Sequence, residues 1–154
     1  MLRLLRRFRR RDHVVQAVVG APGTAVIAAY DDPNYNTINH GLVAERAEGG
    51  LRPVSEFMGL SDSVAAIQAL TATKFTSPIS LICVDTEGND LAVLQSGTWS
   101  DAYLRPLAVI AEILDVSNIR DVVDHPLVEF MQAQNFVFTS RLKESAVFVD
   151  RSIN

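Results

Sequence analysis

The chain has 154 residues, 48% of them hydrophobic, and a net charge of −4. This length suits one domain with a sizeable core, and the acidic balance argues against nucleic-acid binding by the chain as a whole. Its one cysteine, Cys83, excludes an internal disulfide framework and favours a reducing, cytoplasmic location. No apolar run reaches the ~18 residues of a membrane span.

The first eleven residues, MLRLLRRFRRR, combine six arginines with apolar residues three apart, Leu2, Leu5 and Phe8. Three interpretations compete. The segment is an arm for a membrane surface or nucleic acid, a targeting peptide without an apolar core or cleavage site, or a helix whose apolar stripe packs on a sheet. We favour the packed helix.

Residues 13–19 (HVVQAVV) and 24–30 are strands by composition, and Ala21-Pro22-Gly23 between them is a turn, so together they predict a hairpin. The polar loop 31–37 follows. Its Asn36 and Thr37 are candidates to line a ligand pocket, although Asx turns alone would also explain them.

Residues 40–50 show little pattern and are expected to form a loop, and residues 52–58 a short strand. Ser61, Asp62 and Ser63 then offer N-caps for a helix that carries Val64 and Ile67 on one face. Residues 71–78 lead into the next strand.

The stretch on which the interpretation depends is residues 79–97, ISLICVDTEGNDLAVLQSG. Residues 79–84 read as a strand buried on both faces, which makes Cys83 a small buried hydrophobic residue. Asp85, Glu87 and Asp90 follow directly, and residues 89–95 resume helical spacing. In open α/β sheets ligands bind outside the carboxyl ends of the strands. We therefore expect these carboxylates to bind a hydroxyl, act as a base or hold a metal through oxygen, unless they only cap the helix.

Gly97 is the expected C-cap of that helix, and the aromatic Trp99 and Tyr103 are expected to serve packing. Residues 107–113 form the next buried strand, whose Glu112 should lie beside Asp85. Residues 126–134 predict a helix, and the strands 136–140 and 146–150 should pair antiparallel.

Other chemistry has no support in the sequence. The three histidines are scattered and no metal-binding cysteine spacing or H-E-x-x-H occurs, so these residue types predict no metal site. Neither G-x-S-x-G nor a P-loop is present.

The stretch VDTEGNDLAVLQSG, followed by Arg105-Pro106 and VIAEIL, resembles the FkbM-type methyltransferases without gaps from Leu81 to Glu112. Asn36-Thr37 matches a further step of that family. The resemblance implies methyl transfer from S-adenosylmethionine (SAM) to an oxygen of a small molecule or sugar. It makes Asp85 and Glu87 the candidate catalytic residues, with Asn36, Thr37, Asp90 and Glu112 on the acceptor.

The same resemblance implies a partial Rossmann-like, three-layer α/β domain, mostly parallel, with an antiparallel C-terminal strand pair. The family's sheet order is 3-2-1-4-5-7-6, and its glycine turn and ribose-binding acid, which hold SAM, have no counterpart here. We therefore expect one domain, residues 1–154, truncated at its N-terminus. The alternative is a non-catalytic interaction module. The edge of strand 79–84 would be covered by residues 13–30 or by a homo-oligomer.

Overall fold

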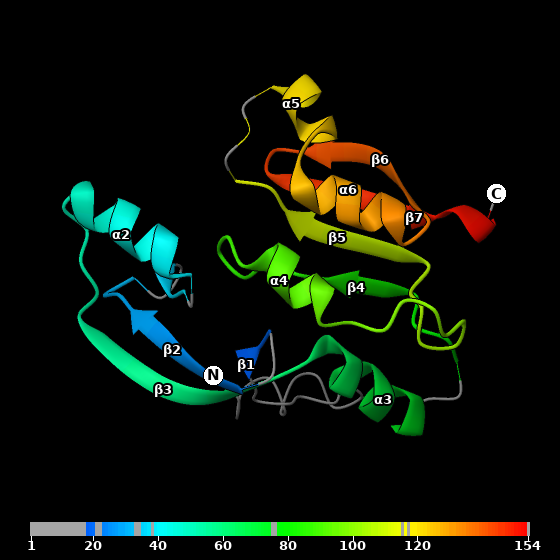
Figure 1. The fold of residues 1–154 in the computed structure, drawn as a ribbon, viewed down its shortest axis with the longest axis horizontal. Helices are drawn as coiled ribbons and strands as arrows, with labels where there is room; N and C mark the ends of the chain where they lie inside the picture. Colours follow the sequence, from blue (N-terminus) through cyan, green and yellow to red (C-terminus); the bar gives the residue numbers. More distant parts are fainter. Residues whose placement is uncertain are drawn as a thin grey trace.

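The computed structural model describes residues 18–20, 23–32, 35–37, 39–74, 77–114, 116 and 118–153. The elements in chain order (Figure 1) are β1 (Val18–Val19), β2 (Gly23–Ala29), α2 (His40–Glu48), β3 (Ser55–Asp62), α3 (Val64–Lys74), β4 (Leu81–Cys83), α4 (Asp90–Gln95), β5 (Ala108–Glu112), α5 (Ile119–Val123), α6 (Pro126–Ala133), β6 (Phe136–Leu142) and β7 (Ser145–Asp150). The expected helix in residues 1–11, and residues 13–17 of the first expected strand, lie outside the described residues.

The larger sheet has four strands in the order β4-β5-β7-β6. β4 runs parallel to β5, whereas β7 runs antiparallel to both β5 and β6. The predicted antiparallel pair at the C-terminus is therefore confirmed, and the mostly parallel sheet is wrong. The reason is the β6–β7 hairpin, whose second strand enters between β6 and β5 and so makes two antiparallel pairs.

The smaller sheet has the order β1-β3-β2. β3 pairs antiparallel with β2 from Gly23↔Ser61 to Ala29↔Ser55, and β1 joins the other edge of β3 in parallel. The predicted hairpin of β1 with β2 is therefore wrong, because β3 pairs along the whole of β2 and separates the two. For the same reason β2 does not lie beside β4.

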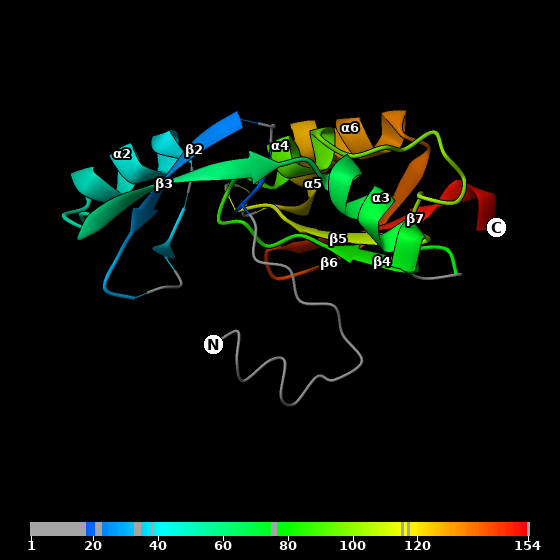
Figure 2. The ribbon, with the colours of Figure 1, turned by 90° about the horizontal axis from the view of Figure 1, so that it is seen from below.

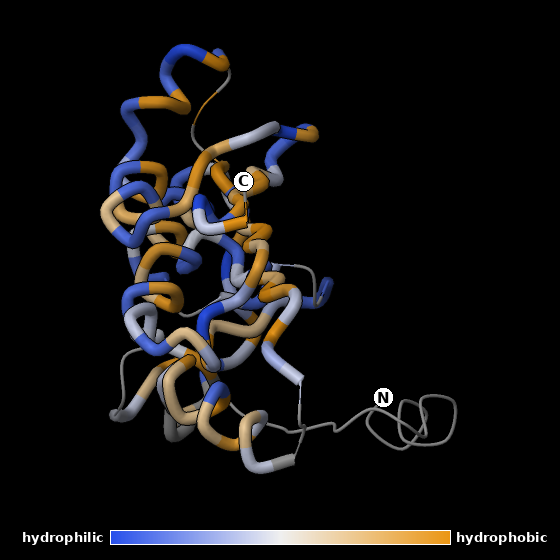
Figure 3. Tube along the Cα trace, turned by 90° about the vertical axis from the view of Figure 1, so that its right-hand side faces the viewer, coloured by the Kyte–Doolittle hydropathy of each residue, from blue (hydrophilic) through white to orange (hydrophobic). Residues whose placement is uncertain are grey.

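The core lies between the four-stranded sheet and the helices α4 and α6, which pack on one face of it (Figure 2). Trp99 is buried there, edge-on to Phe130 and Phe136, which confirms its packing role. Along the helices in Figure 3 hydrophobic and hydrophilic residues alternate, as expected of helices with one packed face.

Three further expectations are corrected. Within the expected loop 40–50, residues His40–Glu48 form α2, because the Asn39 side chain accepts hydrogen bonds from Gly41 N and Leu42 N and caps the helix. The strand at residues 79–84 is not buried on both faces, since Leu81 is 50% exposed and Cys83 is exposed. α4 is capped by Ser96, not by Gly97, which instead packs against the Trp99 ring.

Other elements appear where the sequence placed them. Ser63 Oγ accepts a hydrogen bond from Ala66 N at the start of α3, as an N-cap should. α4, β5 and α6 begin and end within two residues of expectation. α5 was not predicted. In the described part of the chain, no helix has both the length and the apolar character needed to cross a membrane.

Candidate functional site

Three carboxylates converge where β4 and β5 end. Asp85 and Glu87 follow β4, and Glu112 is the last residue of β5. Because the two strands are parallel, their carboxyl ends meet at one edge of the sheet. One side-chain oxygen from each residue lies within 4.8 Å of the others. The predicted meeting of Glu112 with Asp85 and Glu87 is confirmed; we call these three residues the carboxylate cluster.

The turn that presents the cluster has unusual backbone angles. Glu87 has φ 50° and Gly88 has φ 82°, both in the left-handed region. A Cβ on Gly88 would also lie 3.3 Å from the Asn39 side chain. A glycine at position 88 therefore serves both the turn and the close approach of α2.

Asp90 lies beneath the cluster and is 2% exposed. Its Oδ2 accepts hydrogen bonds from Thr86 N (3.2 Å) and Thr86 Oγ1 (2.9 Å), and its Oδ1 accepts one from Glu112 N (2.8 Å). These bonds join the β4–α4 corner to the end of β5. The structure thus places this sequence-predicted site residue inside the protein, where it joins Glu112 to Thr86, the residue between Asp85 and Glu87.

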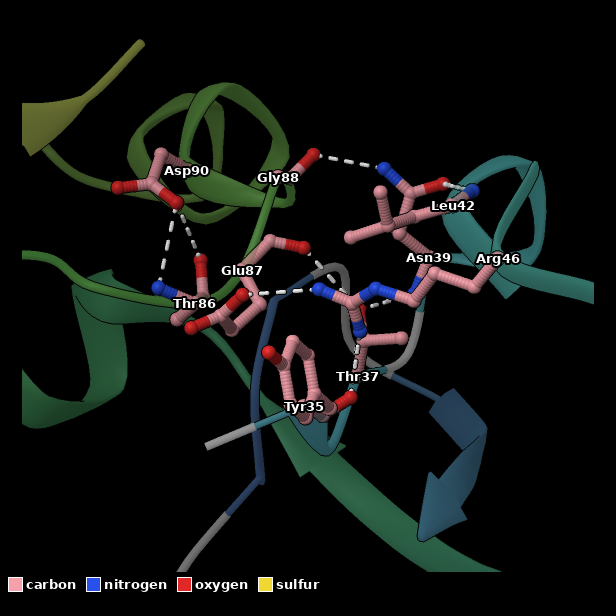
Figure 4. A network of polar contacts seen from close by, with 9 residues as sticks. All are labelled: Tyr35, Thr37, Asn39, Leu42, Arg46, Thr86, Glu87, Gly88 and Asp90. Atoms are coloured by element: carbon pink, nitrogen blue, oxygen red, sulfur yellow. Dashed lines mark hydrogen bonds and ion pairs between the residues drawn. The ribbon is translucent and has the colours of Figure 1, made fainter. Parts of the chain in front are cut away.

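On the side of the Glu87–Gly88 turn, the cluster is bordered by α2 and by Tyr35, Thr37 and Asn39 before it (Figure 4). Thr37 Oγ1 donates to Glu87 O at 3.1 Å, and Asn39 Nδ2 donates to Gly88 O at 2.7 Å. Arg46 Nη2 donates to Glu87 Oε2 at 2.9 Å. Three side chains from around α2 therefore fix the Glu87–Gly88 turn.

Arg46 is also held by aromatic rings. Its guanidinium lies 5.6 Å from the ring centre of Tyr30 and 5.2 Å from that of Tyr35, and it donates to Tyr35 O. Arg46 therefore places one positive charge beside the Glu87 carboxylate. Asp85 and Glu112 have no ion pair among the described residues.

Thr37, which was expected to line a ligand pocket, is 3% exposed and contacts the Glu87 backbone instead. Sequence reasoning missed Asn39 and Arg46. Asn36 faces elsewhere, because its Oδ1 accepts a hydrogen bond from Tyr30 N at 2.9 Å. A local signal could have found Asn39, which is a good N-cap residue directly before α2. Nothing local in the sequence connects Arg46 to Glu87, which is 41 positions away.

The electrostatics of the cluster converge on Glu112. Burial raises its pKa from 4.5 to about 7, and the negative charges of Asp85, Asp90, Glu87 and Glu144 add to the effect. Glu112 Oε2 is buried and has no hydrogen-bond partner among the residues that the structure describes. A carboxylate in this state can accept a proton from a bound group near neutral pH. The three side chains are also close enough to share a hard cation such as Mg²⁺ or Ca²⁺.

A cavity of about 390 Å³ adjoins the cluster on the outer side of β4. Its walls are mainly apolar and come from β1, α3, β4 and α4. Asp85 is the one charged side chain among the described residues that line it. Among the described residues that line the cavity there is no glycine-rich turn, and the one carboxylate, Asp85, belongs to the carboxylate cluster, so these residues lack the features expected of a SAM site.

No family model, curated protein or solved structure matches this chain.

Proposed function

We propose that this chain is the acceptor-binding part of a SAM-dependent methyltransferase of FkbM type, which O-methylates a small molecule or sugar. The observation that carries the proposal is the carboxylate cluster at the ends of two parallel strands, with Glu112 poised to exchange a proton near pH 7. Two further points support it: the resemblance from Leu81 to Glu112, and the strand order β4-β5-β7-β6, which follows the 4-5-7-6 order of that family.

The roles of the chain's own residues follow from the geometry. Asp85 is exposed and can accept a hydrogen bond from an acceptor hydroxyl, while Glu112 takes the hydroxyl proton as the oxygen becomes a nucleophile. Glu87 is held by Arg46 and fixes the turn, and Asp90 positions the Glu112 backbone. Since the described residues do not fit SAM, we assign to this chain only acceptor binding and proton removal.

The test uses isotopically labelled SAM and a panel of sugars, polyols and phenols. It compares the 154-residue chain with the longest in-frame product that contains it. We expect transfer to a hydroxyl by the longer product only, at least about tenfold slower in Asp85→Asn and in Glu112→Gln, with little change in melting temperature. Glu129→Gln, on the exposed side of α6, is the matched control. A large loss of melting temperature in Asp85→Asn, with turnover per folded molecule unchanged, would make Asp85 structural.

A second function, a non-catalytic interaction module, is favoured by one observation. The cavity beside the cluster is apolar and lacks the features that hold SAM. If no product that contains residues 1–154 transfers a methyl group to any acceptor, and Glu112→Gln changes no ligand binding, this second function is the one that stands.

A further inference from the structure

Along its outer side β4 carries backbone groups that no described strand pairs with. Val84 N donates to Ile110 O and Ala108 N donates to Ser80 O, so the even-numbered residues 80, 82 and 84 turn toward β5. In a parallel pair alternate residues bond the same neighbour, and Leu81 and Cys83 therefore direct their N–H and C=O groups away from β5. β4 is the terminal strand of its sheet, and no described strand pairs with that side.

A second strand that is terminal among the described strands borders the same space. β1 is the terminal strand of the smaller sheet, and its Val19 lines the 390 Å³ cavity together with Leu81, Cys83 and Val84 of the β4 region. Two strand edges, one from each sheet, thus border one apolar cavity. Water can hydrogen-bond the exposed groups of such edges, but among protein segments only an extended strand can pair along them, because a helix already uses its own backbone groups.

The walls of the cavity restrict which kind of polypeptide can add a strand to the edge of β4. Val64, Ile67 and Thr71 of α3 and Val19 of β1 form its walls opposite β4. A second copy of this chain would have to bring its own β4 with β1 and α3 beside it, and these would meet the same walls. A single extended segment carries no such flanking elements and can enter.

We propose that this cavity is the docking groove for one extended, apolar segment of a partner polypeptide, which pairs with the outer edge of β4 by strand addition. The segment presents apolar side chains to both Leu81 and α3. It carries a basic residue at the end that meets Asp85, because the carboxylate cluster places negative charge there and Arg46 pairs with Glu87 alone. The inference does not depend on methyl transfer.

The first measurement is amide hydrogen exchange on dilute, monomeric chain. We expect the amides of Leu81 and Cys83 to exchange much faster than those of Ile82 and Val84, which bond toward β5. If Leu81 and Cys83 are protected at every dilution, the chain's own residues cover the edge and the proposal is overturned. Protection that rises with chain concentration makes a second copy the occupant, and protection by added SAM makes it a small molecule; both also overturn it.

The second measurement selects binders from a displayed library of random nine-residue peptides. We expect apolar peptides with a terminal Lys or Arg, weakened at least about tenfold by Leu81→Lys and unchanged by Leu142→Lys. Leu142 is 77% exposed and lies on β6, the opposite edge strand, so it is the matched control.

A third measurement does not rely on a variant that must fold. The best peptide is synthesised twice, N-methylated at one or the other alternate set of amides, which removes hydrogen bonds from one side of an extended strand at a time. At least one set should abolish binding. The proposal is overturned if neither set does, if the library yields no binder, or if binders ignore Leu81→Lys.

Discussion

Protonation of Glu112 couples the site to pH. Its pKa in the folded chain, about 7, lies above the ordinary value of 4.5, mainly through burial and then through the charge of Asp85. A raised carboxyl pKa means that the folded state holds the proton more tightly. This contribution to the free energy of unfolding is fully present below pH 4.5 and is lost as pH rises through about 7.

Above pH 7 the Glu112 carboxylate is charged in its partly buried position, which lowers the free energy of unfolding, and Glu112→Gln removes this loss. We expect the substitution to stabilise the chain at pH 8 by about 1 kcal/mol after solvent screening, which is about 2–4 °C in melting temperature. At pH 4.5 the two forms should melt alike. Melting curves of both at the two pH values test this, with Glu129→Gln as the exposed control. A Glu112→Gln chain that gains nothing at pH 8 contradicts the raised pKa.

Among the elements, α2 is joined to the site through one residue with two tasks. The Asn39 Oδ1 caps the helix, and its Nδ2 donates to Gly88 O. Asn39→Asp keeps the cap and loses the second bond, whereas Asn39→Ala loses both. We expect Asn39→Ala to cost about 2 kcal/mol and Asn39→Asp about half of that, since each bond is worth about 1 kcal/mol. Denaturant melts measure both; an Asn39→Asp chain that loses no stability would mean that the bond to Gly88 contributes nothing, and equal losses in the two variants would mean that the cap contributes nothing.

Arg105 connects three elements around the far end of the sheet. It pairs with Asp150 at the end of β7, donates to Trp99 O and Gln134 O, and lies 4.3 Å from the Phe136 ring centre. Its hydrogen bond lowers the pKa of Asp150, so that part of the stability is present above the ordinary pKa of 3.8 and is lost as pH falls through the lowered pKa. The Arg-Pro step of the family resemblance is thus a structural anchor in this chain.

Arg105→Lys keeps the charge but not the planar fork that makes these bonds. We expect it to cost about 2–4 kcal/mol, close to the loss from breaking a buried ion pair. Urea unfolding at pH 7 checks the value, and Arg120→Lys, on an exposed position of α5, is the control. A loss below about 0.5 kcal/mol, the usual range for surface changes, would contradict the anchor role.

The described part of the molecule has two sheets, and Thr37, Asn39 and Arg46 join their two halves at the Glu87–Gly88 turn, while an apolar cavity lies between β1 and β4. Because the glycine turn and ribose-binding acid are absent from the sequence, we expect the 154-residue chain to bind SAM weakly or not at all. Isothermal titration calorimetry measures this directly, with a melting-temperature shift at saturating SAM as the second readout. Micromolar affinity would contradict the expectation and show that the cavity holds SAM by other residues.

The sequence by itself determined the elements whose signals are local. The apolar runs at β4 and β5, the carboxylates after β4, the cap at Ser63 and the close spacing of β6 and β7 all act within a few residues, so the pattern was sufficient. From those elements the sequence also predicted that Asp85, Glu87 and Glu112 lie close together, because the carboxyl ends of parallel strands meet at one edge of the sheet.

Only the tertiary structure decided which strands are neighbours and which side chains face the site. β3 separates β1 from β2, β4 ends its sheet, and Arg46 reaches Glu87 across 41 positions, because pairing over long distances depends on what the rest of the chain packs against. The burial of Asp90 was likewise decided only by the tertiary structure. Its three hydrogen bonds come from Thr86 and Glu112, and the backbone of Glu112 comes within reach of that carboxylate only when β4 and β5 pair.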